Sequence, residues 1–353
     1  MAPPPLQDHL DARTAPAAPA LVEPLPEGAV RCLACGHRCR IAAGARGACR
    51  MRFNRNGTLR VPRGYVAGLQ CDPIEKKPFF HAFPGRGALS FGMLGCNLHC
   101  AFCQNWISSQ ALRDPEAGAG VEDTTAGTIV DAARRCGAAA VVSTYNEPLI
   151  TAEWAVEIFR LARAAGLACG LVSNGFASPE AIDHLRPWID LCKVDLKCFD
   201  DAAYRGLGGT LDGVLRTIER LVAAGVWVEV VTLLVPGFND GESGLRGTAR
   251  FLAGVSPDLP WHVTAFHPDY RMAGRATTAA DLARAAAIGR EAGLRFVYAG
   301  NRPGETGDLE HTRCPGCGAT LIERAGFRLL RNRLAAGACP DCGRAIPGRW
   351  GTG

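Results

Sequence analysis

Residues 95–106 read GCNLHCAFCQNW and directly follow an apolar stretch, 89–94, with the length and composition of a β-strand. The motif places Cys96, Cys100 and Cys103 in the spacing C-x3-C-x2-C. Such closely spaced thiolates suit a soft metal centre better than disulfides in a reducing cytosol. In a cubane cluster, three cysteines leave one iron without a protein ligand, and an open position is what a catalytic metal site requires. A zinc site completed by His99 is the alternative.

The composition is that of an ordinary globular protein, because 48% of the 353 residues are hydrophobic and 21% are charged. No apolar run approaches the roughly 18–20 residues of a membrane helix, and the first residues lack the pattern of a secretory signal. We therefore expect a cytoplasmic protein without a membrane partner. The net charge of +5 permits an acidic partner without demanding one. The 16 cysteines fall mostly into three close groups, which favours metal ligation over a disulfide framework.

The amino-acid composition and the pattern of apolar residues change along the sequence and divide the chain into four parts. Residues 1–29 are rich in Pro and Ala and predict a disordered tail. Residues 30–84, rich in Cys, Gly and Pro, predict a small irregular module. Residues 85–306 alternate between apolar and amphipathic segments and predict the core, whereas 307–353 predict a separate metal-stabilised module.

Within residues 85–306, repeated strand–helix units predict an α/β fold with a parallel sheet and helices outside it. The predicted strands are 89–94, 138–145, 167–173, 191–197, 226–235 and 262–266, with 295–298 as a seventh candidate. The predicted helices include 125–135, 149–165, 211–224 and 279–292. Six such units suit a partial (β/α)6 barrel, and a doubly wound open sheet is the alternative.

Polar or glycine-rich segments follow the predicted strands. In barrels of parallel strands, active sites form at the carboxyl ends of the strands. After the cysteine motif, these segments are TYNEP (144–148), SNG (173–175), KVDLK (193–197), VPGFND (235–240) and FHP (266–268). A purely structural sheet does not need such residues at every strand end, so we predict the functional site there.

With Phe102 in its aromatic position, the cysteine motif matches the C-x3-C-x-aromatic-C pattern of the radical S-adenosylmethionine (SAM) superfamily. The chain is identified as a member of that superfamily. The resemblance implies a [4Fe–4S] cluster on Cys96, Cys100 and Cys103, whose unique iron binds the amine and carboxylate of SAM. It also implies an external reducing electron donor. Reductive cleavage of SAM then gives a 5′-deoxyadenosyl radical, which abstracts hydrogen from a substrate.

The strand-end segments resemble those of radical SAM enzymes of the pyruvate formate-lyase activating-enzyme type. By this resemblance, Glu147 holds the SAM amine, and a carboxylate suits that role because it accepts charge-assisted hydrogen bonds from an ammonium group. Asn146 stands where the type usually has Gly. The other residues assigned to the cofactor site are Phe102; Ser173 and Asn174, which match a segment that contacts the ribose; Asp195 and Lys197, which match an Asp-Leu-Lys segment in which Lys197 faces the SAM carboxylate; Val235, near the adenine; and His267.

Two of these assignments have structural alternatives. Asp195 and Lys197 could form an internal salt bridge, and His267 could be an ordinary hydrogen-bonded histidine.

Four stretches resemble one narrower family, the radical SAM enzyme of the AmmeMemoRadiSam system. They are 31–39, 72–78, 103–106 and 346–350, and the resemblance runs over nearly the whole chain from Val30. Gly36 departs from the Pro usual in that family. The family name implies two partner proteins and leaves the substrate unknown. A glycyl-radical-enzyme activating enzyme and a non-enzymatic metal-binding adaptor are the alternative functions.

Two further sets of cysteines flank the core. The N-terminal set, Cys32, Cys35, Cys39 and Cys49, could hold a structural zinc ion or an auxiliary iron–sulfur cluster. The C-terminal set forms the paired Cys-x2-Cys knuckles of a zinc ribbon, for which we expect Zn²⁺ with a rubredoxin-like iron as the alternative. Its members are Cys314, Cys317, Cys339 and Cys342. Four arginines lie between these knuckles: Arg324, Arg328, Arg331 and Arg333. We expect them to form a solvated face rather than to bind a nucleic acid.

Overall fold

The computed structural model describes residues 6–351, which are organised around an eight-stranded sheet. Seven neighbouring strands are parallel, and β8 (Gly68–Pro73) joins one edge antiparallel to β9. The parallel strands are β9 (Gly87–Gly92), β11 (Ala140–Ser143), β12 (Ala168–Ser173), β13 (Leu191–Asp195), β14 (Trp227–Leu234), β15 (Trp261–Ala265) and β16 (Val297–Gly300). Each overlaps a predicted strand, the seventh candidate included, so the predicted parallel sheet is confirmed.

The strands lie in the sheet in their order along the chain, from β9 to β16, without a reversal. A doubly wound sheet reverses its strand order at a switch point, so the doubly wound alternative is wrong. The edges of the sheet in the described range are β8 and β16, which do not pair with each other. Closure of the sheet into a partial barrel therefore stays a prediction.

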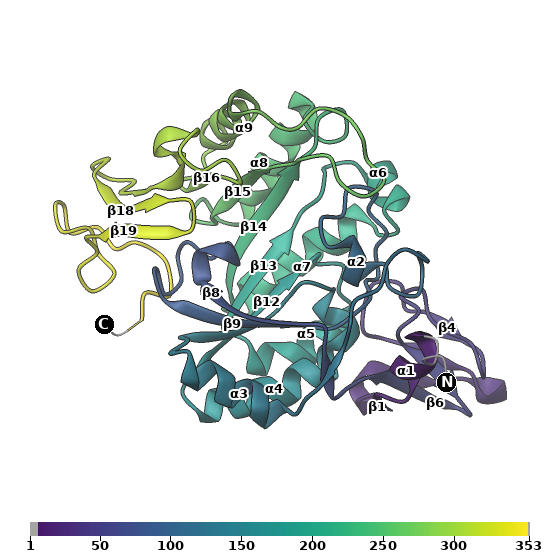
Figure 1. Ribbon diagram of the computed structural model, residues 1–353. Coiled ribbons are helices and arrows are strands. Elements are labelled where there is room, and N and C mark those ends of the chain that lie inside the picture. The colour runs from purple at the N-terminus through teal and green to yellow at the C-terminus, as the bar shows by residue number, and fades with distance from the viewer. Residues whose placement is uncertain (1–5, 352–353) are drawn as a thin grey trace.

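Helices cover the outside of the sheet, as Figure 1 shows. They are α3 (Ala126–Arg135), α4 (Ala152–Ala164), α5 (Pro179–Leu185), α7 (Leu211–Ala223), α8 (Glu242–Val255) and α9 (Ala279–Glu291). The hydroxyl of Ser178 accepts a hydrogen bond from the backbone N–H of Ala181 and caps the start of α5. Short elements complete this part: β7 (Tyr65–Val66), α2 (Trp106–Ser109), β10 (Glu122–Asp123) and α6 (Asp201–Gly206).

Residues 6–29 are folded, which corrects the prediction of a disordered tail for this part of the chain; residues 1–5 lie outside the described range. After α1 (Leu6–Asp11), β1 (Thr14–Pro16) pairs with β6 (Thr58–Pro62), and β2 (Val22–Pro24) pairs with β3 (Val30–Cys32). Leu10 and Leu21 are 3% and 0% exposed. The Pro-rich composition is compatible with order because proline suits extended edges and the first turn of short helices.

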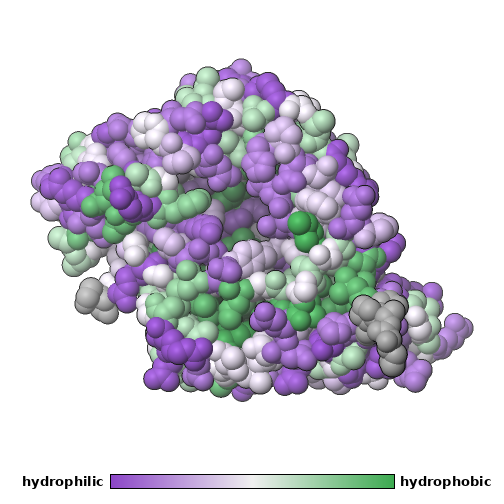
Figure 2. All heavy atoms as spheres, viewed as in Figure 1, coloured by the Kyte–Doolittle hydropathy of each residue, from purple (hydrophilic) through white to green (hydrophobic). Residues whose placement is uncertain are grey.

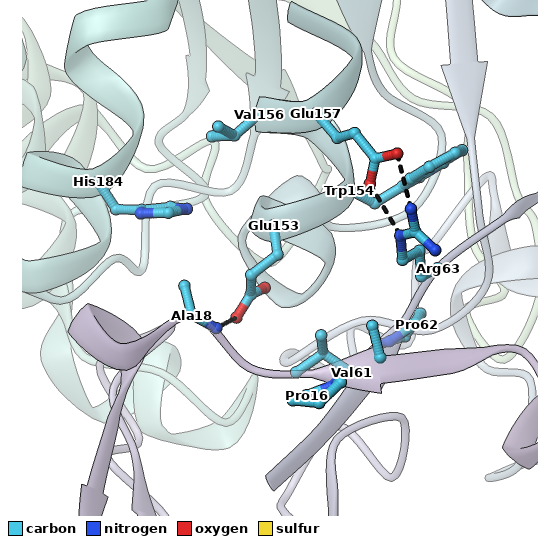
Figure 3. Close-up of a pocket in the computed structure, with 11 residues that line it drawn as sticks. Pro16, Ala18, Val61, Pro62, Arg63, Glu153, Trp154, Val156, Glu157 and His184 are labelled. Carbon is cyan, nitrogen blue, oxygen red and sulfur yellow. Dashed lines mark hydrogen bonds and ion pairs between the residues drawn. The ribbon is translucent and has the colours of Figure 1, made fainter. Parts of the chain in front are cut away.

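Figure 3 shows where this segment meets α4. The backbone N–H of Ala18 donates to Glu153 (3.4 Å), and Arg63 forms an ion pair with Glu157 (2.8 Å). The cavity between them, about 230 Å³, has no cysteine in its lining. We therefore treat it as a packing seam between the N-terminal segment and the core.

The boundaries expected at residues 84 and 306 do not separate independent modules. Strand β8, expected in the N-terminal module, pairs with β9 over its whole length. The C-terminal strands β17 (Thr312–Arg313), β18 (Thr320–Ala325) and β19 (Arg328–Asn332) form their own sheet, yet Leu321 and Ile322 share a buried cluster with Phe80 and Tyr298 of the core. The remaining short strands are β4 (Arg40–Ile41) and β5 (Phe53–Arg55).

Arg324 does not belong to a solvated arginine face. Its side chain is fully buried and donates to the carbonyl oxygen of Phe80 (2.7 Å) and to the hydroxyl of Thr312 (2.9 Å). Burial of so large a cation requires partners on several sides. Arg324 therefore fastens the C-terminal sheet to the core. Nowhere in the described range is a helix long and apolar enough to cross a membrane.

The anchoring of the N-terminal segment can be tested by replacing Leu21 with Ala. Because Leu21 is fully buried, the change should lower the free energy of unfolding by about 2–5 kcal/mol. Leu161→Ala is the matched control, since Leu161 is 45% exposed and its truncation should change stability by about 0.5 kcal/mol or less. Urea unfolding followed by tryptophan fluorescence measures both. Equal stability of the two variants would contradict the packing described for residues 6–29.

Candidate active site

The three motif cysteines lie just beyond the carboxyl end of β9 and line a cavity of about 130 Å³. Residues in or beyond the carboxyl-terminal parts of the neighbouring strands line the same cavity: Asn146, Glu147, Asn174, Lys193, Asp195 and Lys197. A larger cavity of about 430 Å³ shares Cys100, Cys103 and Asp195 with it, so the two are contiguous. Figure 2 shows this face of the molecule hollowed near its centre. The cysteine motif and the segments at the ends of β11, β12 and β13 therefore meet at one site, as the topology predicts.

The cysteine loop is held by the residues around it. Gly95 has φ 90°, a conformation that favours glycine, and its N–H donates to the carbonyl oxygen of Ser108 (2.9 Å). The Ser109 hydroxyl lies 3.1 Å from the Cys103 sulfur. Burial raises the pKa of Cys100 to about 12. Such a thiol ionises only when a strong positive charge, such as a metal centre, compensates the thiolate.

The spacing of these cysteines separates a cluster site from a site for a single ion. In a tetrahedral zinc site, ligand sulfurs lie about 3.8 Å apart, given Zn–S bonds of about 2.3 Å. The motif cysteines do not gather within 4.8 Å of one another, whereas the C-terminal set does. They therefore do not form the compact arrangement of a site for a single tetrahedral ion. The alternative zinc site with His99 is not supported, because the His99 side chain is exposed and packs over Gly208.

Glu147 is the central buried acid of the cavity and is 2% exposed. Its carboxylate accepts hydrogen bonds from the Ser173 hydroxyl (2.7 Å), the Asn174 backbone N–H (2.8 Å) and the Leu149 N–H (3.1 Å). Burial nevertheless raises the pKa of Glu147 to about 7. Ser173 and Asn174 therefore orient this carboxylate, and a cationic ligand would satisfy the charge that burial opposes.

Residues before Glu147 shape its approach to the cysteines. Tyr145 has φ 70°, which is uncommon for a bulky residue and is a form of strain that concentrates at functional sites. The side-chain oxygen of Asn146 accepts from the Met93 N–H (2.9 Å), and this bond ties the segment after β11 to the end of β9. Asn146 thus lines the cavity and also positions its neighbour Glu147.

Asp195 and Lys197 form the internal salt bridge that was the structural alternative for this pair, at 2.8 Å. Lys193, which the sequence places on the same face, pairs with the same carboxylate from its other side. The two lysines hold the pKa of Asp195 at about 2, against the opposing effect of burial. All three side chains still line the cavity, so the ion pair and a site role coexist.

The remaining predicted cofactor residues are placed differently. Phe102 is buried, lines the larger cavity and packs against Phe238 at 5.1 Å between ring centroids. Val235 is fully buried and lines neither of the two cavities. His267 is exposed, and its ring lies 3.4 Å from the carbonyl oxygen of Pro268. The structure therefore does not bring His267 to the site.

Several residues of the site had no clear signal in the sequence. His262, rather than the predicted His267, lines the larger cavity. Its Nε2 atom lies 2.7 Å from Oε2 of the buried Glu229. Lys77 lies in the stretch 72–78, which carries part of the family resemblance. Its side chain is 4% exposed, donates a hydrogen bond to Asp72 (3.0 Å) and lies beside the ring of Tyr145. Alternation along 262–266 could have placed the side chain of His262 on one face of its strand. Nothing local reveals that the segment carrying Lys77 folds over the same cavity.

The C-terminal cysteines lie in the positions of a tetrahedral metal site. The sulfurs of Cys314 and Cys342 are 3.5 Å apart, and those of Cys317 and Cys339 are 3.7 Å apart. These separations match the edge of about 3.8 Å expected around one Zn²⁺ or a similar ion. The N–H of Gly316 donates to the Cys314 sulfur (3.4 Å), as in knuckles that hold a metal-bound thiolate. One ion would complete this site.

Comparison with known proteins places the chain in a family. Residues 92–252 match the radical SAM superfamily. An uncharacterized protein of Methanocaldococcus jannaschii is 36% identical over 331 residues, which cover 92% of this chain and 97% of that protein. The isethionate sulfite-lyase activating enzyme of Oleidesulfovibrio alaskensis is 28% identical over 33% of this chain and 40% of its own length. The chain belongs to the radical SAM superfamily and is related to its activating enzymes.

Two solved structures are similar to parts of this fold. A radical SAM methyltransferase from Sphaerobacter thermophilus is 17% identical, with a TM-score of 0.49 over 85% of this chain and 83% of that one. A domain of pyruvate-formate lyase-activating enzyme from Bacteroides vulgatus is 19% identical, with a TM-score of 0.39 over 46% of this chain and 99% of that one.

The tetrahedral site can be tested by metal analysis of Cys339→Ser. Loss of one of four ligands should remove about one bound ion per chain, measured by mass spectrometry of the purified protein. Cys136→Ser is the control, because Cys136 is exposed and belongs to none of the three sets. If Cys339→Ser and the control retain equal amounts of metal, the C-terminal set does not bind an ion.

Proposed function

We propose that this protein cleaves SAM at a [4Fe–4S] cluster bound by Cys96, Cys100 and Cys103. The observation that carries the proposal is the open three-cysteine site facing a buried carboxylate across one cavity. The cluster supplies the electron that breaks a sulfonium C–S bond. Membership of the radical SAM superfamily supports this chemistry. It also replaces the adaptor alternative, because the superfamily consists of enzymes.

The chain's own residues have distinct tasks in this proposal. Glu147 accepts hydrogen bonds from the SAM ammonium group, and Ser173 and Asn174 fix the direction of its carboxylate. Lys197 faces the SAM carboxylate while Asp195 limits its freedom. Phe102 and its neighbours exclude water from the reacting atoms, which protects a radical from side reactions.

The larger cavity is the proposed substrate site. Its volume of about 430 Å³ suits a small molecule or a single side chain. Lysines outnumber carboxylates in its lining, which includes Lys76, Lys77, Lys193 and Lys197. The two partner proteins of the AmmeMemoRadiSam system remain our proposed sources or recipients of this substrate, and a reducing protein is the proposed electron donor.

A glycyl-radical-enzyme activating function is the second candidate. It is favoured by the similarity to the isethionate sulfite-lyase activating enzyme and to a Methanocaldococcus jannaschii protein named for the activation of glycyl-radical enzymes, 27% identical over 168 residues. In that case, 5′-deoxyadenosine would form in step with a stable protein radical in a partner, visible by electron paramagnetic resonance.

For the C-terminal set of cysteines we propose Zn²⁺, because it prefers tetrahedral thiolate sites.

The SAM cleavage is tested by anaerobic reconstitution with iron and sulfide, reduction with SAM present, and chromatography of the products. Wild type should form 5′-deoxyadenosine, and Cys100→Ala should form none because its cluster lacks a ligand. Cys136→Ala serves as the control and should behave as wild type. Wild type that binds zinc without iron and forms no product would contradict the proposal.

The role of Glu147 is tested by SAM binding to the oxidised protein, measured by calorimetry. Loss of a charged hydrogen-bond acceptor costs about 1.5–3 kcal/mol, so Glu147→Gln should weaken SAM binding about tenfold to hundredfold. Iron content should not change. The matched control is Glu157→Gln, which removes a carboxylate that forms an exposed pair with Arg63. Equal SAM affinity of Glu147→Gln and wild type would remove Glu147 from the cofactor site.

A further inference from the structure

The N-terminal cysteine set has no part in the site described above, yet it lies beside it. Cys32, Cys35 and Cys49 are at most 7% exposed. His37 has its Nε2 atom 2.8 Å from the carbonyl oxygen of Asn97, the residue that follows Cys96. The loops that carry the N-terminal set and the motif cysteines are therefore in direct contact.

One buried side chain lies between the two cysteine sets. Asn97 is 1% exposed, and its Oδ1 accepts from Asn174 (2.7 Å) at 3.8 Å from the Cys96 sulfur. At the other end of the amide, Nδ2 has no hydrogen-bond partner in the described part of the chain, and the side chain faces the Cys35 thiol. A buried donor without an acceptor is costly. A donor in this position stabilises the ionised form of Cys35, and the thiolate is the form that binds a metal centre.

A second buried donor faces the same set. Arg52 is 1% exposed and binds Glu153 through both terminal nitrogens (2.6 and 2.9 Å), while its Nε has no partner within residues 6–351. The guanidinium lies close enough to Cys32 and Cys49 to interact electrostatically with both. Because arginine stays charged when buried, an anionic group beside it is favourable. A cluster bound by thiolates is such a group.

The spacing of the sulfurs indicates which kind of centre would fit. The C-terminal cysteines gather within 4.8 Å of one another, as a single ion requires. No three cysteines of the N-terminal set do so, and the motif cysteines at the proposed [4Fe–4S] site do not either. The N-terminal set thus lacks the compact arrangement of a site for a single tetrahedral ion. Backbone donors also reach its sulfurs, as Ala48 N–H does at Cys39 (3.4 Å), and such bonds are typical around iron–sulfur clusters.

We propose that Cys32, Cys35, Cys39 and Cys49 bind a second iron–sulfur cluster, separated from Cys96 by the side chain of Asn97. The proposal rests on the proposed function, since it takes Cys96 as a ligand of the catalytic cluster. A low-potential, one-electron protein donor would reduce the second cluster, which passes the same electron to the catalytic one. The donor is then oxidised by one electron, the catalytic cluster is reduced by one, and the second cluster is unchanged. No bond is made or broken and no proton moves.

The test uses the full chain, reconstituted without oxygen, with iron, zinc and acid-labile sulfide measured per chain. In a variant with Cys96, Cys100 and Cys103 all changed to Ala, about two to four iron ions and as many sulfides should remain. Sulfide is the decisive quantity, because an iron ion in the C-terminal set would bring none. Adding Cys35→Ser to this variant should remove the remaining sulfide, whereas adding Cys136→Ser should not.

The outcomes are distinguishable. If the triple variant holds no sulfide, the inference is overturned: about two zinc or iron ions per chain would then place a single ion in the N-terminal set, and about one would leave that set empty. If Cys35→Ser alone, with the motif intact, binds no iron or sulfide while the triple variant does, the proposed function fails and the second cluster stands. Circular dichroism checks the folding of each variant. Should Cys35→Ser fail to fold, the sulfide content of the triple variant still decides the inference.

Discussion

Three thiolates cannot complete the coordination of a four-iron cluster, and the open position of the cluster that we propose would face the polar carboxyl edge of the sheet. The loop that carries Cys96, Cys100 and Cys103 leaves β9 through Gly95, whose positive φ turns the chain toward the cavity. Neighbouring strands then bring polar side chains to the same edge because all are parallel. A ligand that binds the open iron must therefore also meet these side chains.

Charge in a buried cavity is the second constraint on this arrangement. Glu147 is buried and Asp195 is partly buried, and the groups around these two carboxylates differ. Two lysines hold the pKa of Asp195 at about 2, whereas Glu147 has only neutral hydrogen-bond donors and its pKa is raised to about 7. The charge of Asp195 is thus neutralised within the protein, whereas Glu147 has no cationic partner among residues 6–351. This difference makes Glu147 the better candidate for binding an ammonium group.

Much of this arrangement could be predicted from the sequence because it depends on short-range patterns. The period of the apolar segments gave the seven parallel strands, and the strand-end rule located Glu147, Asn174 and Asp195 at one edge. His267 lies in an exposed loop after β15 and lines neither of the two cavities, whereas His262 lines the larger one from the strand itself, so a site role for His267 stays a prediction.

Other features depend on contacts between distant parts of the chain and left no local signal. The Pro- and Ala-rich residues 6–29 are ordered because Leu10 and Leu21 find buried positions against later segments. The sequence alone does not distinguish Arg324 from a surface arginine, because its burial depends on contacts with Phe80 and Thr312. The contact between the N-terminal cysteines and Asn97 is of the same kind.

The most direct test of the central claim is electron–nuclear double resonance of the reduced, reconstituted protein with SAM labelled with ¹⁵N at its amine. The account predicts a hyperfine coupling between the cluster and this nitrogen, because the open iron and Glu147 hold the amine together. An electron paramagnetic resonance spectrum that SAM leaves unchanged, with no ¹⁵N coupling, would contradict it.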